Sequence, residues 1–245
     1  MAAFTAGTDY YHRPLLEIAN QNGDPELLRI CFEIGHPDTI CLDDGYLVGC
    51  RYNNNPSTAW LDVLYEFDFQ HWRTNPRQLG EWRTWREILF QGPECTRWWI
   101  RHGGSTPKLR GLFEYYTAPN LKRWPGAASI RILLDHFGIE WFKDSGTLQF
   151  AVENHDFAAV KMLVEAGADV NEEVTDWHYD VREYRQAPLP ALHQAVYAKS
   201  EEMIVYLAAH GAKVRREWTE DKYNTTPEQF KVYKKLVADL GAVKD

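Results

Sequence analysis

The 245-residue sequence has few cysteines and no long hydrophobic run. Its cysteines lack the close pairing of zinc ligands, and no histidine pair has metal-ligand spacing on one helix, so we expect buried thiols and no metal. No segment approaches the roughly 20 apolar residues that span a bilayer. The first residues lack the basic and apolar regions of a secretory signal. We therefore expect a cytoplasmic protein without a membrane partner.

The sequence also lacks the established motifs of enzymes. No glycine-rich phosphate loop follows a strand, no GxSxG motif is present, and no cysteine has an identifiable catalytic partner. We expect no cofactor. The formal net charge of −8 opposes sequence-independent binding of nucleic acid, which needs a basic face, so we expect no nucleic-acid partner. The segments 71–73, 82–86 and 97–101, rich in arginine and tryptophan, are interpreted as core tryptophans alternating with solvated arginines.

The chain is rich in aromatic residues and in helical patterns. It contains 10 Trp, 13 Tyr and 11 Phe, enough to fill gaps between helices and to form an aromatic surface. Apolar spacing predicts one helix near 148–152 and a second near 160–164, which Gly167 ends because glycine readily adopts the left-handed conformation of a helix C-cap. An interval of 16 residues recurs between Ala19 and Gly35, Ala151 and Gly167, and Ala195 and Gly211.

The segment 145–171, which ends in GADVN, resembles an ankyrin repeat, and the PALHQA sequence at 190–195 resembles the start of another. The resemblance implies an all-α solenoid of helix-turn-helix repeats that occupies residues 1–245 as one domain. About six repeats are expected, the middle ones degenerate, at 13–45, 46–81, 82–111, 112–143, 144–189 and 190–222. A capping helix at 226–241 is expected to cover the last repeat.

The connection 172–189 is longer than an ankyrin repeat needs. Gly167 and Gly211 lie 44 residues apart, about 11 more than the usual period of about 33. In ankyrin-like stacks such fingers and the first helices line a concave surface, so the resemblance implies a protein partner bound there. The residues that we expect to contact this partner are Trp72, Trp141, Trp177, His178, Tyr179, Arg182 and Tyr184.

Two other interpretations of this finger stay open. Its aromatic residues could fold onto their own neighbours, since long loops are often packed by their own side chains. Alternatively, the groove could hold a small apolar metabolite that the protein isomerises, cyclises or dehydrates without a cofactor. The acid-base residues for that chemistry would be Asp176, His178, Tyr179, Asp180 and Arg182. His193 occupies the histidine position of the repeat start and is interpreted as structural.

Overall fold

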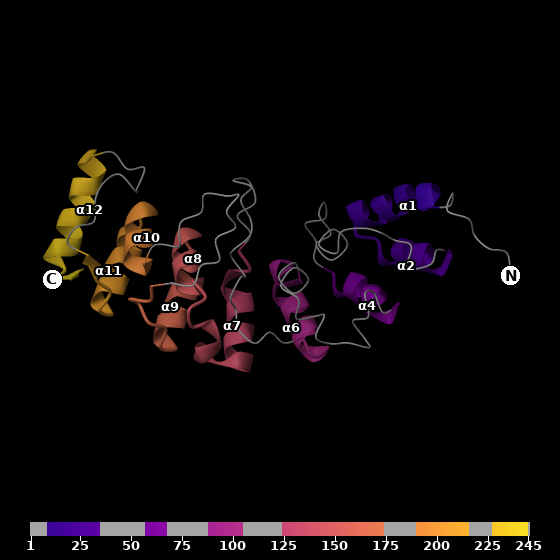
Figure 1. The fold of residues 1–245 in the computed structure, drawn as a ribbon, viewed down its shortest axis with the longest axis horizontal. Coiled ribbons are helices and arrows are strands. Elements are labelled where there is room, and N and C mark those ends of the chain that lie inside the picture. Colours follow the sequence, from indigo (N-terminus) through magenta and orange to yellow (C-terminus); the bar gives the residue numbers. More distant parts are fainter. Residues whose placement is uncertain are drawn as a thin grey trace. The chain divides into compact units, whose positions relative to one another are not determined.

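The computed structural model describes residues 9–34, 57–67, 88–104, 124–173, 190–215 and 227–244. The chain forms two compact units, residues 1–106 and 107–245. Both units are helical in the described residues, as Figure 1 shows. The prediction of a helical protein is therefore confirmed, whereas the division into six repeats within one domain stays a prediction.

Unit 1 is a row of helices in which each packs on the next. Each helix buries the side chains that helical spacing places on one face, for example Leu28 and Phe32 in the second helix and Trp60 and Leu64 in the third. Stacking of the Phe32 ring on Phe67, with centroids 5.2 Å apart, links these two helices. The helices are α1 (Asp9–Asn22), α2 (Pro25–Ile34), α4 (Thr58–Glu66) and α6 (Pro93–Arg101).

Helix α6 carries the predicted alternation of tryptophan and arginine. Trp98 and Trp99 are 1% and 0% exposed, while Arg97 and Arg101 are exposed, so this interpretation is confirmed for segment 97–101. The indole of Trp98 donates a 2.7 Å hydrogen bond to Asp62 on α4. The helix begins at Pro93, because proline fits the first helical position.

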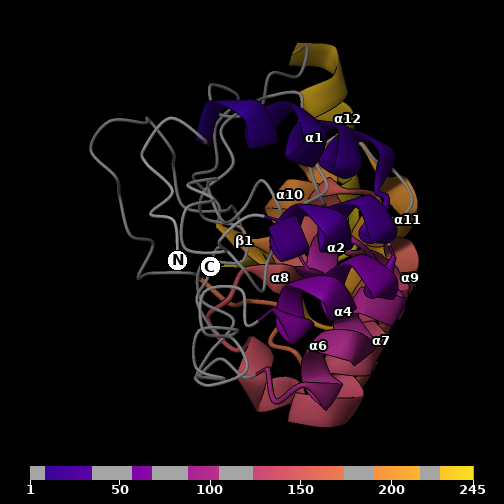
Figure 2. The same ribbon diagram turned by 90° about the vertical axis from the view of Figure 1, so that its right-hand side faces the viewer.

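Unit 2 arranges paired helices in two rows. Helix α8 packs on α9 and α10 packs on α11, while α8 also packs on α10 and α9 on α7. First helices therefore lie beside first helices, and second helices beside second helices, as Figure 2 shows for α8 and α10. The elements are α7 (Gly126–Phe137), η4 (Ile139–Phe142), α8 (Thr147–Glu153), α9 (Phe157–Glu165), α10 (Ala191–Tyr197), α11 (Glu201–Ala209), β1 (Val214–Arg215), α12 (Pro227–Asp239) and β2 (Val243–Lys244).

The same turn joins the two helices of three pairs. A residue with positive φ ends the first helix, and the next residue caps the second helix by accepting a hydrogen bond from a backbone N–H three residues later. The residues with positive φ are Gly23, His155 and Lys199, and the capping residues are Asp24, Asp156 and Ser200. In each pair the backbone N–H of the capping residue also donates to an alanine carbonyl, that of Ala19, Ala151 or Ala195.

Helices α9, α11 and α12 of unit 2 also end alike. Each ends at a glycine with positive φ, and the alanine that follows donates a backbone hydrogen bond of 2.9–3.0 Å to a buried residue five positions earlier. The three glycines are Gly167, Gly211 and Gly241, and the buried acceptors are Leu163, Leu207 and Val237. The predicted helix ends at these glycines are confirmed, and α12 lies within the predicted capping helix 226–241.

Hydrogen bonds connect the segments that follow these glycines. The side chain of Asn171 donates to Gly211 O at 3.0 Å and accepts from Lys213 N at 2.8 Å. One step further, β1 pairs in parallel with β2, with Val214 opposite Val243. The segment after Gly167 is thus bonded to the segment after Gly211, which in turn pairs with the segment after Gly241. The start of the 172–189 finger is therefore fixed to the rest of unit 2.

Candidate functional site

Most of the residues expected to bind a partner lie outside the described part of the chain. These are Trp72, Trp177, His178, Tyr179, Arg182 and Tyr184, together with Asp176 and Asp180 of the acid-base set. Glu172 and Glu173 are the described residues of the 172–189 finger, and they follow directly on Asn171. The described part of the candidate site is therefore the base of this finger, which we call its root.

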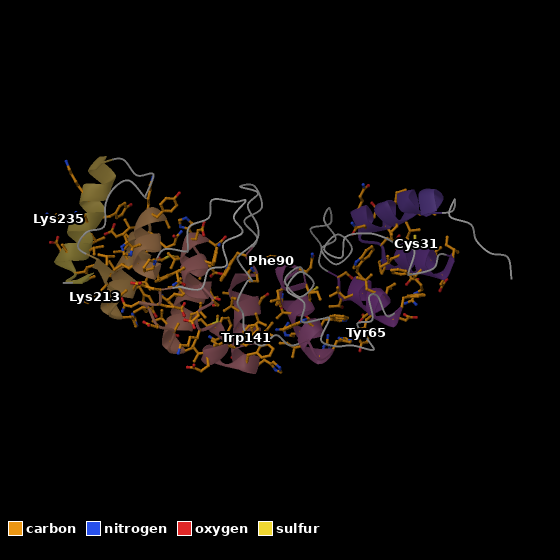
Figure 3. The ribbon with its side chains drawn as sticks, viewed as in Figure 1. Cys31, Tyr65, Phe90, Trp141, Lys213 and Lys235 are labelled. Carbon is orange, nitrogen blue, oxygen red and sulfur yellow. The ribbon has the colours of Figure 1, made fainter. Side chains whose placement is uncertain are left out.

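Trp141 is described, and it lies in the core. Its side chain is 8% exposed in η4, where it stacks on Phe137 with ring centroids 4.4 Å apart and meets the edge of Phe142 at 5.3 Å. Figure 3 labels this side chain beside α7, the helix on which η4 packs. Too little of the ring is exposed to anchor a partner, so Trp141 leaves the set of candidate contact residues.

A pocket of about 330 Å³ opens at the root of the finger. It lies between η4 and the start of α8 on one side and the end of α9 and Glu172 on the other. The sequence alone did not predict this pocket, because its walls come from two separate segments of the chain, 139–148 and 163–172. The described lining residues are Ile139, Glu140, Phe142, Lys143, Asp144, Thr147, Leu148, Leu163, Gly167, Ala168, Asp169 and Glu172.

The walls of this root pocket combine apolar side chains with acids. Ile139, Phe142, Leu148 and Leu163 provide the apolar surface, and Lys143 is the one basic residue among the described residues that line it. The acids are Glu140, Asp144, Asp169 and Glu172. Such a pocket suits a small ligand or a partner side chain that is apolar along its length and uncharged or positive at its tip.

Glu172 is the best-held acid of the root pocket. Its carboxylate accepts a 2.6 Å hydrogen bond from the backbone N–H of Asp144, a residue with a φ of 60°, and its carbonyl accepts one from the Gln149 side chain at 3.0 Å. Burial raises the pKa of Glu172 above its ordinary value of 4.5, and the nearby charges of Asp144 and Asp169 add to the rise. The hydrogen bond from the backbone N–H of Asp144 to this carboxylate partly offsets the rise.

Ionisation of Glu172 is expected to destabilise unit 2. Because the pKa of Glu172 is higher in the folded protein, the folded state keeps a proton that the unfolded chain releases as the pH rises above about 4.5. The free energy of unfolding should therefore fall with rising pH until the folded pKa is passed, and then stay reduced. Glu172→Gln keeps an acceptor for Asp144 N–H but cannot ionise, so this fall should be absent. Urea unfolding at a series of pH values measures the difference.

The exposed Glu201→Gln serves as the matched control, since it also removes one acid from unit 2. This variant retains Glu172, so its stability should still fall with rising pH. An equal fall in stability with pH in wild type and in Glu172→Gln would contradict the assignment to Glu172.

The described cysteines are buried, as the sequence predicts. Cys31 and Cys95 are free thiols, and burial raises the pKa of both, that of Cys95 to about 11. Both stay protonated at neutral pH and are therefore poor nucleophiles. Cys41 and Cys50 lie outside the described residues.

The part of the chain that the structure describes holds neither a cluster of metal ligands nor a helix that could cross a membrane. No group of three or more His, Cys, Asp or Glu side chains among them is arranged to hold a metal ion. None of the helices in that part of the chain has the length and apolar character needed to cross a membrane.

His193, interpreted as structural, is 6% exposed within α10.

Comparison of the chain with models of known protein families, with curated proteins and with solved structures gives no match. Function must therefore be inferred from the residues themselves.

Proposed function

We propose that this chain is an ankyrin-type repeat protein that binds a protein partner through its concave face and the finger 172–189. One observation carries the proposal: three helix pairs share one turn, and helices α9, α11 and α12 share one ending, which indicates a repeated unit. A repeated helix pair buries its apolar face only by stacking on its neighbours, and such stacks present long concave surfaces to partners. The aromatic finger extends the surface with residue types that are enriched at interfaces.

The position of the finger root supports a role in binding. Asn171 and Glu172 are held by hydrogen bonds to Gly211, Lys213 and Asp144, so residue 173 leaves from a fixed place. A loop that departs from a fixed root loses less entropy on binding than one that departs from a mobile root. We expect Trp177, Tyr179 and Tyr184 to supply the anchors.

Partner capture tests this proposal. Immobilised wild type should retain a partner that is identified by mass spectrometry, purified and then titrated. Trp177→Ala with Tyr179→Ala should weaken its binding at least tenfold, since loss of an aromatic anchor often costs 2 kcal/mol or more. Val205→Ala, an exposed apolar change on α11, is the matched control and should bind like wild type. Equal binding by the finger double variant would refute the proposed surface.

The root pocket favours a second candidate function, cofactor-independent chemistry on a small apolar metabolite. Its apolar walls and the raised pKa of Glu172 suit proton transfer in a site from which water is partly excluded. Asp176, His178, Tyr179, Asp180 and Arg182 would complete the acid-base set. Thermal unfolding with and without a small-molecule extract of the source cells decides between the candidates. A ligand at 100 times its dissociation constant stabilises by about 2.7 kcal/mol, and no shift would leave protein binding as the proposed function.

A further inference from the structure

The root pocket carries more negative than positive charge. Four acids line it against one lysine, a formal net charge of −3 over its described lining residues. Asp144 and Glu172 are half-buried, while Glu140 and Asp169 are exposed. The ion pairs among the described residues join other side chains, so neither these acids nor Lys143 has a charged partner there. The negative charge of the pocket is therefore uncompensated by the described part of the chain.

The neighbouring segment of unit 2 does not supply the missing positive charge. Asn171, two residues after Asp169, accepts a hydrogen bond from the backbone N–H of Lys213. The ammonium group of Lys213 donates to the carbonyl of Gly241, which follows α12, and is thus bound to the next segment of the unit. A cation for the root pocket must therefore come from outside the described residues.

The spread of the acids indicates what kind of cation fits. Among the described residues, no three His, Cys, Asp or Glu side chains are arranged to hold a metal ion. A guanidinium group spreads its charge and its N–H donors over a plane, so it can meet carboxylates that lie too far apart for one metal ion. The arrangement therefore favours an extended organic cation.

The apolar walls suit the stem of an arginine side chain. The apolar residues of the lining are Ile139, Phe142, Leu148 and Leu163. The methylene groups of arginine pack on such a surface while its charged end reaches polar groups. The ammonium group of lysine is more strongly hydrated than a guanidinium, so it gains less in a site from which water is partly excluded. Arginine therefore fits both the acids and the walls better than lysine does.

Hydrogen bonds join the walls of the pocket before any ligand binds. The carboxylate of Glu172 accepts from the backbone N–H of Asp144 at 2.6 Å, and the Glu172 carbonyl accepts from the Gln149 side chain at 3.0 Å. On the same wall as Glu172, the carboxylate of Asp169 accepts from the backbone N–H of Asn171 at 2.8 Å. Carboxylates that are already held in this way lose little side-chain entropy when a cation arrives.

We propose that the protein partner inserts an arginine side chain into the root pocket, where the guanidinium pairs with acids of its lining. This proposal rests on the proposed binding of a protein partner through the finger 172–189, because the pocket lies at the root of that finger. Arginine and the large aromatic residues are the types that contribute most to binding at protein interfaces. The arginine site and the aromatic residues of the finger thus belong to one surface.

Titration with an isolated arginine side chain tests the class of ligand. The probe is N-acetyl-L-arginine amide, whose charge lies on the guanidinium, and binding is followed by NMR of the isotope-labelled full chain. Its dissociation constant should be on the order of 1–10 mM, and the shifted amide signals should belong to 139–148 and 163–172. N-acetyl-L-citrulline amide has nearly the same shape but no charge. It should bind at least about tenfold more weakly, because charge-assisted hydrogen bonds are the stronger ones.

Variants of the lining test the acids. Asp169→Asn with Glu172→Gln keeps both hydrogen-bond acceptors but removes two charges, so it should bind the arginine probe at least about tenfold more weakly. Glu201→Gln with Glu202→Gln, which removes two exposed acids of α11, should bind the probe like wild type. Circular dichroism checks that each variant is folded. If the double variant of the lining is not folded, Asp169→Asn alone replaces it and should still weaken binding.

Binding of the captured partner separates this proposal from the proposed function. If Asp169→Asn with Glu172→Gln binds the partner like wild type while Trp177→Ala with Tyr179→Ala does not, the finger is used and the arginine site is wrong. If the finger variant binds like wild type, the proposed surface is wrong whatever the result with the arginine probe.

Three results of the titration would overturn the arginine site. The first is wild type that shows no shifted signals at probe concentrations on the order of 100 mM. The second is a citrulline probe that binds as tightly as the arginine probe, because the pocket then recognises an uncharged ligand. The third is an arginine probe that binds only after Arg182→Gln with Arg185→Gln, because an arginine of the finger itself would then occupy the pocket.

Discussion

Replacing Trp99 by alanine is expected to lower the free energy of unfolding of unit 1 by about 3–5 kcal/mol. The side chain is 0% exposed in α6, and its removal would leave a cavity that rigid neighbours cannot fill. The ring also lies against Gly104, whose backbone N–H donates a 2.9 Å hydrogen bond to the carbonyl of Trp99. A methyl group added at Gly104 would lie 2.4 Å from the indole nitrogen, so the fit leaves no room for a larger residue.

Hydrogen exchange followed by mass spectrometry on peptides from 88–104 measures this loss within unit 1. Arg97→Ala, an exposed change on the same helix, should stay within about 0.5 kcal/mol of wild type. Gly104→Ala should also destabilise unit 1 by about 1–3 kcal/mol, through overpacking, and most of that loss should vanish when Trp99 is already alanine. If Gly104→Ala and Trp99→Ala lower the free energy of unfolding additively, Gly104 and Trp99 are not in contact.

Replacing Leu207 by alanine is expected to cost unit 2 about 2–5 kcal/mol. Leu207 is 0% exposed on α11, and this helix packs on both α10 and α12. Its carbonyl accepts the backbone hydrogen bond of Ala212, which closes the helix ahead of β1. Leu207→Ala should therefore also destabilise α12, because strand β2, which follows α12, pairs with β1.

The matched control for this second prediction is Val205→Ala, which removes an apolar side chain that is 42% exposed on the same helix. Urea unfolding followed by circular dichroism should show little change for Val205→Ala and a clear fall in midpoint for Leu207→Ala. Faster hydrogen exchange in peptides from 227–244 would report the coupling to α12. Unchanged exchange there would show that α12 is held without α11.

Features encoded within a few residues could be predicted from the sequence. Gly167, Gly211 and Gly241 end helices because glycine takes positive φ at little cost, and each lies in a segment whose apolar spacing already predicts a helix. His155 and Lys199 also have positive φ although they are not glycine. Their residue types therefore gave no sign of the turns that follow α8 and α10. The recurring interval of 16 residues, and not the residue type, was the useful signal for those pairs.

Features that depend on distant residues could not be predicted. Trp141 carries no local sign of burial, and only the 3₁₀ turn after Gly138 brings its ring onto Phe137. The hydrogen bond between Asp144 and Glu172 joins residues 28 positions apart, and both residues line the root pocket. Likewise, apolar spacing predicts that α2 is a helix but not that Ile30 and Ile34 are left uncovered.

The links through Asn171 and the β1–β2 pair have a mechanical consequence. They join consecutive segments along the direction in which the helix pairs of unit 2 succeed one another. Tension along that direction acts on all of these bonds in series, because each helix pair contacts only its neighbours, and the weakest link opens first. Unit 2 should therefore behave as a compliant spring that lengthens in small steps and recoils when the load is released.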